Sequence, residues 1–270
     1  MAARTDPKAG NAAGKPGGGG DDSTHVKPFV FEGRGAKALH FSINEVQSRM
    51  RLDDPDGLDL AYTRTMMGFL LFMPEPRRIV MVGLGGGSLA KFCHRHLPGA
   101  HITVAEINPH VIALRSDFGV PPDSERFAVL LADGARYVRG LVPAPDVLLV
   151  DGFDYHGLPD SLGSQRFYDD CHASLADGGW LVQNLHLGDR RYEVLVDRLR
   201  RSFDDAVLVV DDADGCNSIV FANKGATLRQ YKPGIVRPPS GLEPAAAALL
   251  LAAFSAVAGA LKQHRITGGG

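Results

Sequence analysis

The chain has 270 residues, of which 44% are hydrophobic, so it can form one large α/β domain or one domain with a small appendage. Its formal net charge of -2 excludes a general electrostatic attraction to nucleic acid. Three cysteines, Cys93, Cys171 and Cys216, are far apart and match no metal-binding spacing, which indicates buried thiols in a reducing compartment and a cytoplasmic protein.

The N-terminal part of the chain is predicted to be a tail followed by a small sheet. Residues 1–24 are rich in Gly, Ala, Lys and Asp and lack the apolar segment of a signal peptide, so we expect a disordered tail. Residues 25–57 follow as a small N-terminal β appendage, with its strands expected within residues 28–51. A helix over residues 58–72 then begins the main domain, which we place at residues 58–225.

The main domain opens with a strand at residues 78–82, a glycine turn at 83–87, a helix at 88–96 and a second strand at 102–107 that carries Glu106. This order forms half of a nucleotide-binding βαβ unit. Glycines let the backbone approach a ligand closely, and the following helix offers free N–H groups. Because Glu106 can accept both hydroxyls of a ribose, the unit predicts an adenosine-containing cofactor.

The rest of the domain alternates apolar strands with helices. Several strands are apolar throughout, as expected when helices cover both faces of a parallel sheet. Only residues 211–217 separate the last two strands, which favours an antiparallel hairpin. The sequence therefore predicts the Rossmann-like, seven-stranded fold of the S-adenosylmethionine-dependent transferases, with a mostly parallel sheet and an antiparallel edge hairpin. The further strands are expected near 127–131, 147–151, 180–185, 206–210 and 218–222, and the further helices near 109–118, 135–141, 164–175 and 190–203.

Residues 226–270 form a C-terminal extension with an Ala/Leu-rich run at 244–261. This run falls slightly short of the roughly 20 residues that a membrane span needs, and alanine contributes little to insertion. We therefore expect a helix packed on the body or on a second subunit, and no membrane association.

The spacing of the turn glycines and the order of the acids discriminate between cofactors. A dinucleotide enzyme has the pattern G-x-G-x-x-G, whereas here Ser88 stands at the last position of that pattern. Acids follow three further strands or turns as Asp133 (with Gly134), Asp151 and Asp154. Such acids can simply cap the next helix. Four of them at successive strand ends favour a binding site, in which Asp133 accepts the adenine amino group and Asp151 and Asp154 face a cationic substrate.

The order of these motifs resembles the polyamine aminopropyltransferases, the spermidine synthase group, over about residues 39–221. The resemblance implies a donor, decarboxylated S-adenosylmethionine, a small amine acceptor, no metal and a homodimer. It also implies that Asp154 deprotonates or orients the attacking amine and that Gln47 touches the nucleoside. The segments that carry it are 46–49, Tyr62, 82–91, 105–108, 132–135, 151–154 and 158–168. The candidate catalytic residues are Asp154, Asp151 and Tyr62, and the candidate cofactor-binding residues are Gln47, Gly83, Gly85, Gly86, Glu106, Asp133, Gly134 and Asp151.

Departures from the family pattern fall at the groups that recognise amines. Gly86 stands where the family has an acid that holds the amine of the donor, Arg64 replaces an acid, and Tyr155 replaces a proline. Asp211, Asp212 or Asp214 can supply the missing charge. Two alternatives stay open beside an aminopropyltransferase: a methyltransferase or other transferase that uses intact S-adenosylmethionine, and a non-catalytic nucleoside-binding or scaffold protein.

Overall fold

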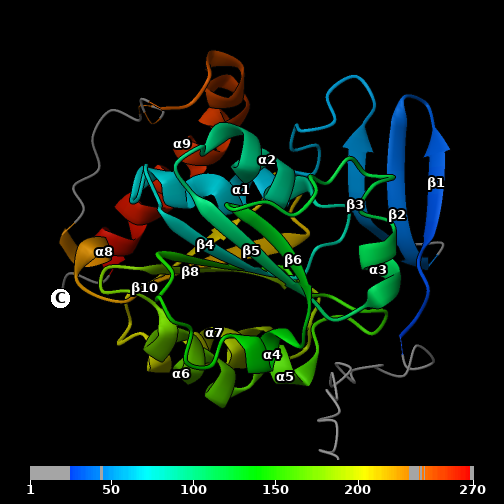
Figure 1. Cartoon of the computed structure of the whole chain (residues 1–270). Helices are drawn as coiled ribbons and strands as arrows, with labels where there is room; N and C mark the ends of the chain where they lie inside the picture. Colours follow the sequence, from blue (N-terminus) through cyan, green and yellow to red (C-terminus); the bar gives the residue numbers. More distant parts are fainter. Residues whose placement is uncertain (1–24, 43–44, 231–236, 238, 240, 268–270) are drawn as a thin grey trace, which may run out of the picture.

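A central seven-stranded sheet with a separate three-stranded sheet beside it organises the protein, shown in Figure 1 as a computed structural model. The structure describes residues 25–42, 45–230, 237, 239 and 241–267. The predicted tail, residues 1–24, lies outside the described residues, as do residues 231–236, 238, 240 and 268–270 of the predicted C-terminal extension.

The central sheet has the strand order β6-β5-β4-β7-β8-β10-β9. The first five of these strands pair in parallel, and β10 runs antiparallel to both β8 and β9, so the predicted fold is confirmed. The chain leaves β4 toward one edge and returns to β7 on the other side, which places a ligand-binding switch point between the ends of β4 and β7. The strands are β4 (Arg78–Val82), β5 (His101–Glu106), β6 (Phe127–Leu131), β7 (Val147–Val150), β8 (Trp180–His186), β9 (Val207–Asp211) and β10 (Asn217–Asn223).

Two hydrophobic layers lie on the two faces of this sheet because successive side chains of a strand point to opposite faces. In β4, Ile79 and Met81 enter one layer and Val80 and Val82 enter the other. One face is covered by α4 (Gly134–Tyr137), α5 (Asp160–Gly163), α6 (Gln165–Ser174) and α7 (Tyr192–Ser202), and the other by α1 (Ala61–Met66), the 3₁₀-helix η1 (Met67–Leu71), α2 (Ser88–His96) and α9 (Pro244–Thr267) (Figure 1).

Several predicted helices differ from the observed ones at their ends. The helix expected to reach residue 118 is α3 (Pro109–Ala113), and the chain continues in turns, with the Phe118 carbonyl accepting a hydrogen bond from Lys91 instead of closing a helical turn. The short helices α5 and α8 (Thr227–Gln230) were not predicted, because single helical turns carry too little periodicity to be recognised.

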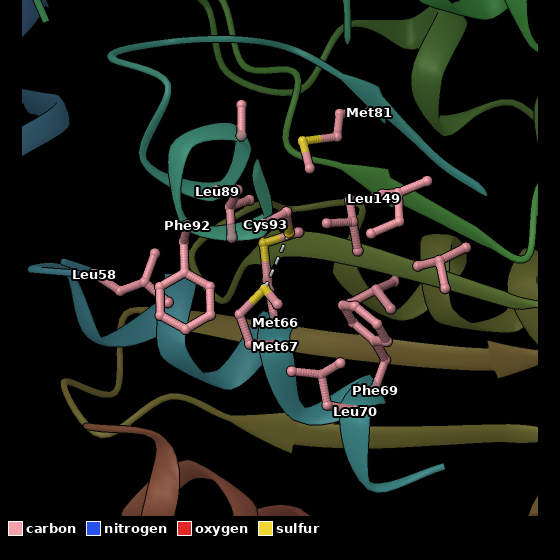
Figure 2. Packing of buried hydrophobic residues seen from close by; sticks show 14 of the residues in the cluster. Leu58, Met66, Met67, Phe69, Leu70, Met81, Leu89, Phe92, Cys93 and Leu149 are labelled. Carbon is pink, nitrogen blue, oxygen red and sulfur yellow. Dashed lines mark hydrogen bonds between the residues drawn. The ribbon is translucent and has the colours of Figure 1, made fainter. Parts of the chain in front are cut away.

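The layer between α2 and α1 is filled by sulfur-containing and aromatic side chains (Figure 2). Met66, Met67 and Phe92 are fully buried, and the Cys93 thiol lies 3.8 Å from the sulfur of Met67. Burial raises the pKa of the Cys93 thiol. Cys171 is buried as predicted, but the prediction is wrong for Cys216, which is exposed because it lies at the tip of the edge hairpin.

The N-terminal sheet is an antiparallel meander of β1 (Phe29–Gly33), β2 (Ala36–Ser42) and β3 (Glu45–Arg51). Lys91 in α2 links the segment that follows β3 to the main domain. Its buried ammonium donates to the carbonyl of Pro55 at 2.6 Å and to the carbonyl of Phe118 at 2.7 Å. Its Nζ also lies 3.0 Å from the sulfur of Met50 in β3. Burial lowers the pKa of Lys91 to about 8. These bonds hold β3 next to the glycine turn.

Helix α9 is longer than predicted. Lys262 and the residues after it continue the helix, so its 21-residue segment Pro244–His264 is long and apolar enough to cross a membrane by length and composition, while 33% of its apolar window is buried in the protein. The expectation that α9 packs on the body without membrane association stays a prediction. One face of α9 packs against α1, η1 and β9. That face consists of Ala246, Leu250, Ala253, Phe254, Val257 and Leu261, whereas Leu251 on the outer face is 46% exposed.

Because one face of α9 packs on the body, shortening a side chain on that face should lower the free energy of unfolding more than shortening one on the outer face. Phe254→Ala should lower the free energy of unfolding by about 3–5 kcal/mol, because it empties a fully buried site. Leu251→Ala should change it by less than about 0.5 kcal/mol. Denaturant-induced unfolding of the two variants measures both values, and equal effects would contradict the docked position.

Candidate active site

A large pocket opens at the carboxyl ends of β4, β5 and β7 and has a volume of about 1260 Å³. Gly86 does not line it, but all other predicted site residues do. These are Gln47, Tyr62, Gly83, Gly85, Glu106, Asp133, Gly134, Asp151 and Asp154. Among the residues that the structure describes, no group of three or more His, Cys, Asp or Glu side chains is arranged to hold a metal ion.

The first glycine of the turn brings two strand ends together. Gly83 has a φ of 95°, and a Cβ at this position would lie 2.3 Å from the backbone carbonyl oxygen of Asp151. A side chain is therefore excluded by both conformation and contact. The turn after β4 consequently lies directly against the residue that follows β7.

Glu106 ties the glycine turn to the end of β5. One oxygen of its carboxylate accepts the backbone N–H of Leu84 at 2.8 Å, and the other accepts the N–H of Asn108 at 2.8 Å. Burial raises the pKa of Glu106, and these backbone donors oppose the rise. Each carboxylate oxygen has a second acceptor position, so Glu106 can still accept two hydroxyl groups from a ligand in the pocket.

Asp133 caps a helix and also lines the pocket. Its Oδ1 accepts the backbone N–H of Ala135 at 2.9 Å, which makes it the N-cap of α4. The same residue and the following Gly134 line the pocket. Helix capping thus fixes the orientation of a carboxylate that faces the pocket.

Asp151 is held by two side-chain donors in the pocket. Its Oδ2 accepts the hydroxyl of Tyr62 at 3.0 Å, and its Oδ1 accepts the side-chain amide of Asn184 at 2.9 Å. Burial raises the pKa of Asp151, while these two donors lower it. Burial and the nearby Asp151 raise the pKa of Tyr62 well above its usual value. Tyr62 therefore stays a neutral donor to the carboxylate.

Asp154 lies in an exposed loop beyond Asp151. Its Oδ1 accepts the backbone N–H of His156 at 2.7 Å, and its backbone bridges to Gly157. Tyr155 and His156 are exposed and line the same pocket. Asp154 is thus accessible to a ligand and is oriented by its own loop.

Polar residues that the sequence reasoning missed lie on the opposite wall of the pocket. Asn184 in β8 contacts Asp151, and Asn217 at the start of β10 donates its amide to Asn184 at 2.9 Å. The signal for Asn184 was available, since Gln183 and Asn184 interrupt an otherwise apolar strand. Asn217 carried no comparable signal, because its place depends on pairing between β8 and β10.

Arg191 links two loops that line the pocket, the one after β7 and the one after β8. Its guanidinium pairs with Asp189 at 2.8 Å and with Asp160, and it donates to the Leu158 carbonyl at 2.7 Å. Arg191 therefore binds structural partners from both sides of the pocket lining. Arg64 likewise donates to the carbonyls of Leu58 and Asp59.

The acids of the edge hairpin are not part of the pocket lining, which contradicts their suggested role as substitutes for the missing acids. Asp212 is buried, and its Oδ1 accepts the backbone N–H groups of Cys216 at 3.1 Å and Asn217 at 3.2 Å. Asp211 accepts the hydroxyl of Ser218 at 2.8 Å. These carboxylates stabilise the hairpin turn.

Gly86 is buried behind the pocket wall. A Cβ on it would lie 2.7 Å from Oγ of Ser48 in β3 and 2.9 Å from the ring of Phe118. The Ser48 hydroxyl lies 3.4 Å from that of Ser88, and both serines line the pocket. At this point of the turn the pocket therefore presents neutral hydroxyls rather than an acid.

Comparison with known proteins gives a consistent result. A polyamine aminopropyltransferase of Chromobacterium violaceum is 40% identical over 205 residues, 75% of this chain and 78% of the relative. One from Neisseria meningitidis serogroup A is 38% identical over 203 residues, 74% and 77% of the two chains. A spermidine synthase crystallised with the transition-state analogue AdoDATO shares the fold, with a TM-score of 0.64, 20% identity and coverage of 84% and 81%. No protein-family model matches the chain.

The crowding at Gly86 predicts that an acid cannot simply be installed there. Gly86→Asp should lower the free energy of unfolding by about 1–3 kcal/mol, because the new side chain overpacks Ser48 and Phe118. Gly99→Asp is the matched control, since a Cβ on Gly99 meets nothing within 4 Å. Denaturant-induced unfolding compares them, and equal stability of the two variants would show that the turn has room for the acid.

Proposed function

The chain belongs to the polyamine aminopropyltransferase family, and from this premise we propose that its pocket transfers an aminopropyl group from decarboxylated S-adenosylmethionine to a small amine. The chain is accordingly a transferase, and the hypothesis of a non-catalytic scaffold is set aside. The observation that carries the proposal is one pocket that holds Glu106 and Asp133 together with the Asp151–Tyr62 pair.

The nucleoside of the donor belongs at the glycine turn. Glu106 offers two acceptor positions to the ribose hydroxyls, and Asp133 offers an acceptor to the adenine amino group. Gln47 approaches from β3, which Lys91 holds in place. This arrangement leaves Asp151 and Asp154 on the acceptor side of the same pocket.

The chemistry requires a neutral amine, whereas primary amines have pKa values of about 10 and are protonated at neutral pH. Asp154 accepts the proton of the attacking amine, and Asp151 holds the charged end of the acceptor. The amine nitrogen then bonds to the propyl carbon while the carbon–sulfur bond breaks, and methylthioadenosine leaves with the electron pair on sulfur. Positioning of the amine in line with that bond supplies much of the acceleration.

The form of the donor is a separate question. Gly86 lacks the acid that would pair with the amine of decarboxylated S-adenosylmethionine, and Ser48 and Ser88 offer hydroxyls that suit an ammonium or a carboxylate. This observation keeps intact S-adenosylmethionine as the second candidate donor, with methyl transfer as its reaction. The relatives in the family favour the decarboxylated form.

Binding of product nucleosides tests the donor. Isothermal titration calorimetry on purified protein should show binding of methylthioadenosine, weakened in Glu106→Gln because a carboxylate oxygen becomes a donor amide next to the backbone N–H groups. Preference for S-adenosylhomocysteine over methylthioadenosine would favour the intact donor. Failure to bind either nucleoside would sink the cofactor assignment.

The role of Asp154 is tested by turnover. Asp154→Asn should lower kcat by about 10²–10⁴-fold, because the general base is lost, while methylthioadenosine binding persists. Release of methylthioadenosine from decarboxylated S-adenosylmethionine and a diamine gives the rate. Asp117→Asn, an exposed carboxylate outside the pocket, is the control. Turnover of Asp154→Asn at the control's rate would mean that another group takes the proton.

A further inference from the structure

A chain of hydrogen bonds runs from the edge hairpin to the buried carboxylate of the pocket. The side-chain amide of Asn217 donates to Oδ1 of Asn184 at 2.9 Å, and the amide of Asn184 donates to Oδ1 of Asp151 at 2.9 Å. The three residues come from β10, β8 and the end of β7. Two side chains thus link the outer hairpin to the group that faces the acceptor.

The direction of these bonds is set by the carboxylate. An ionised Asp151 only accepts hydrogen bonds, so Asn184 must turn its NH₂ group toward it. The carbonyl of Asn184 then faces the opposite way and needs a donor, which Asn217 provides. All dipoles in the chain point their positive ends toward Asp151, and each bond polarises the next.

Asn217 is held at this position by its backbone. Its N–H donates to the Asp212 carboxylate at 3.2 Å, and its carbonyl accepts the N–H of Asp212 at 2.8 Å. In the antiparallel register Asn217 pairs with His186, and Asn184 pairs with Ile219, so the two asparagines are diagonal neighbours on one face of the sheet. The side chain of Asn217 lines the pocket and is only half-buried.

We propose that Asn217 is a positioning residue for the acceptor half of the reaction, which fixes the amide of Asn184 with its NH₂ group toward the Asp151 carboxylate. The role in catalysis rests on the proposed aminopropyl transfer, in which an ionised Asp151 holds the charged end of the amine. Without the donor at position 217, the amide of Asn184 is free to present its carbonyl to the carboxylate, which disfavours the ionised form.

The expected consequence is a change in pH dependence. Burial already raises the pKa of Asp151, and the amide of Asn184 opposes that rise. Weakening this bond raises the pKa further, so acceptor binding is lost at a higher pH as the solution is acidified. The other titratable groups that line the same pocket come from several elements. They are His25 before β1, Tyr62 from α1, Glu106 from β5, Asp133 after β6, Asp154, Tyr155, His156 and Asp160 after β7, and His186, Asp189, Arg190 and Arg191 from the end of β8 and its loop.

Two substitutions at position 217 distinguish the effect of losing the hydrogen-bond donor from the effect of losing side-chain volume. Asn217→Ala removes the donor, and Asn217→Asp replaces it by an acceptor of the same shape that opposes the carbonyl of Asn184. The acidic limb of the pH profile, where kcat/KM for the amine falls on acidification, should move to higher pH. The shift should be about 0.5 unit in Asn217→Ala and about 1 unit in Asn217→Asp. The rise in the alanine variant matters most, because that variant adds no charge.

Asp214→Asn is the control, since it changes an exposed charge on the same turn outside the pocket and should leave the acidic limb in place. A second measurement does not depend on turnover. In protein labelled with ¹³C-carboxyl aspartate, the resonance absent from Asp151→Asn identifies Asp151, and its titration midpoint should rise in Asn217→Ala.

The outcomes separate this proposal from the proposed function. An unchanged midpoint of Asp151 in both variants at position 217 would overturn the positioning role, whether or not the protein transfers aminopropyl groups. A raised midpoint in a protein that releases no methylthioadenosine would support the hydrogen-bond chain and count against the reaction.

Discussion

Two carboxylates buried at the ends of parallel strands set the main constraint on this protein. A buried charge is costly unless it is hydrogen-bonded, and Glu106 and Asp151 are satisfied by neutral donors instead of cations. A cationic partner would have neutralised them and blocked the pocket. Because their donors are backbone amides, a phenol and a side-chain amide, no cation compensates the charge that either carboxylate carries when it is ionised, and both retain acceptor positions for a ligand.

Two of the cations near the pocket, Arg191 and Lys91, are bound to other groups than these two carboxylates. Arg191 is paired with Asp189 and Asp160, and Lys91 is directed at carbonyls behind the glycine turn. Their charges are compensated away from Asp151. A donor that carries a sulfonium and an acceptor that carries an ammonium therefore find uncompensated carboxylates, whose attraction is strengthened by the low polarity of a buried site.

The sequence allowed us to predict the mostly parallel sheet with its edge hairpin, and most of the candidate residues that share the pocket, because a parallel sheet collects the carboxyl ends of its strands at one edge. Glu106, Asp133 and Asp151 each follow such a strand, so their neighbourhood depends on local sequence. Asn217 and Ser48 could not be assigned in this way. Their positions depend on the antiparallel register of β10 and on the packing of β3 across the glycine turn, which local patterns do not encode.

The contact between Gly86 and Ser48 links two features that the sequence presents separately. The turn lacks the family's acid, and β3 fills the space that the acid's side chain would occupy. Lys91 holds the chain on both sides of this contact through Pro55 and Phe118, so withdrawal of β3 together with Pro55 would cost the buried ammonium one of its two carbonyl acceptors. A side chain at position 86 and the present position of Ser48 therefore compete for the same space. The hydroxyls of Ser48 and Ser88, which come from the N-terminal sheet and from the helix after the turn, consequently line the pocket beside Gly86.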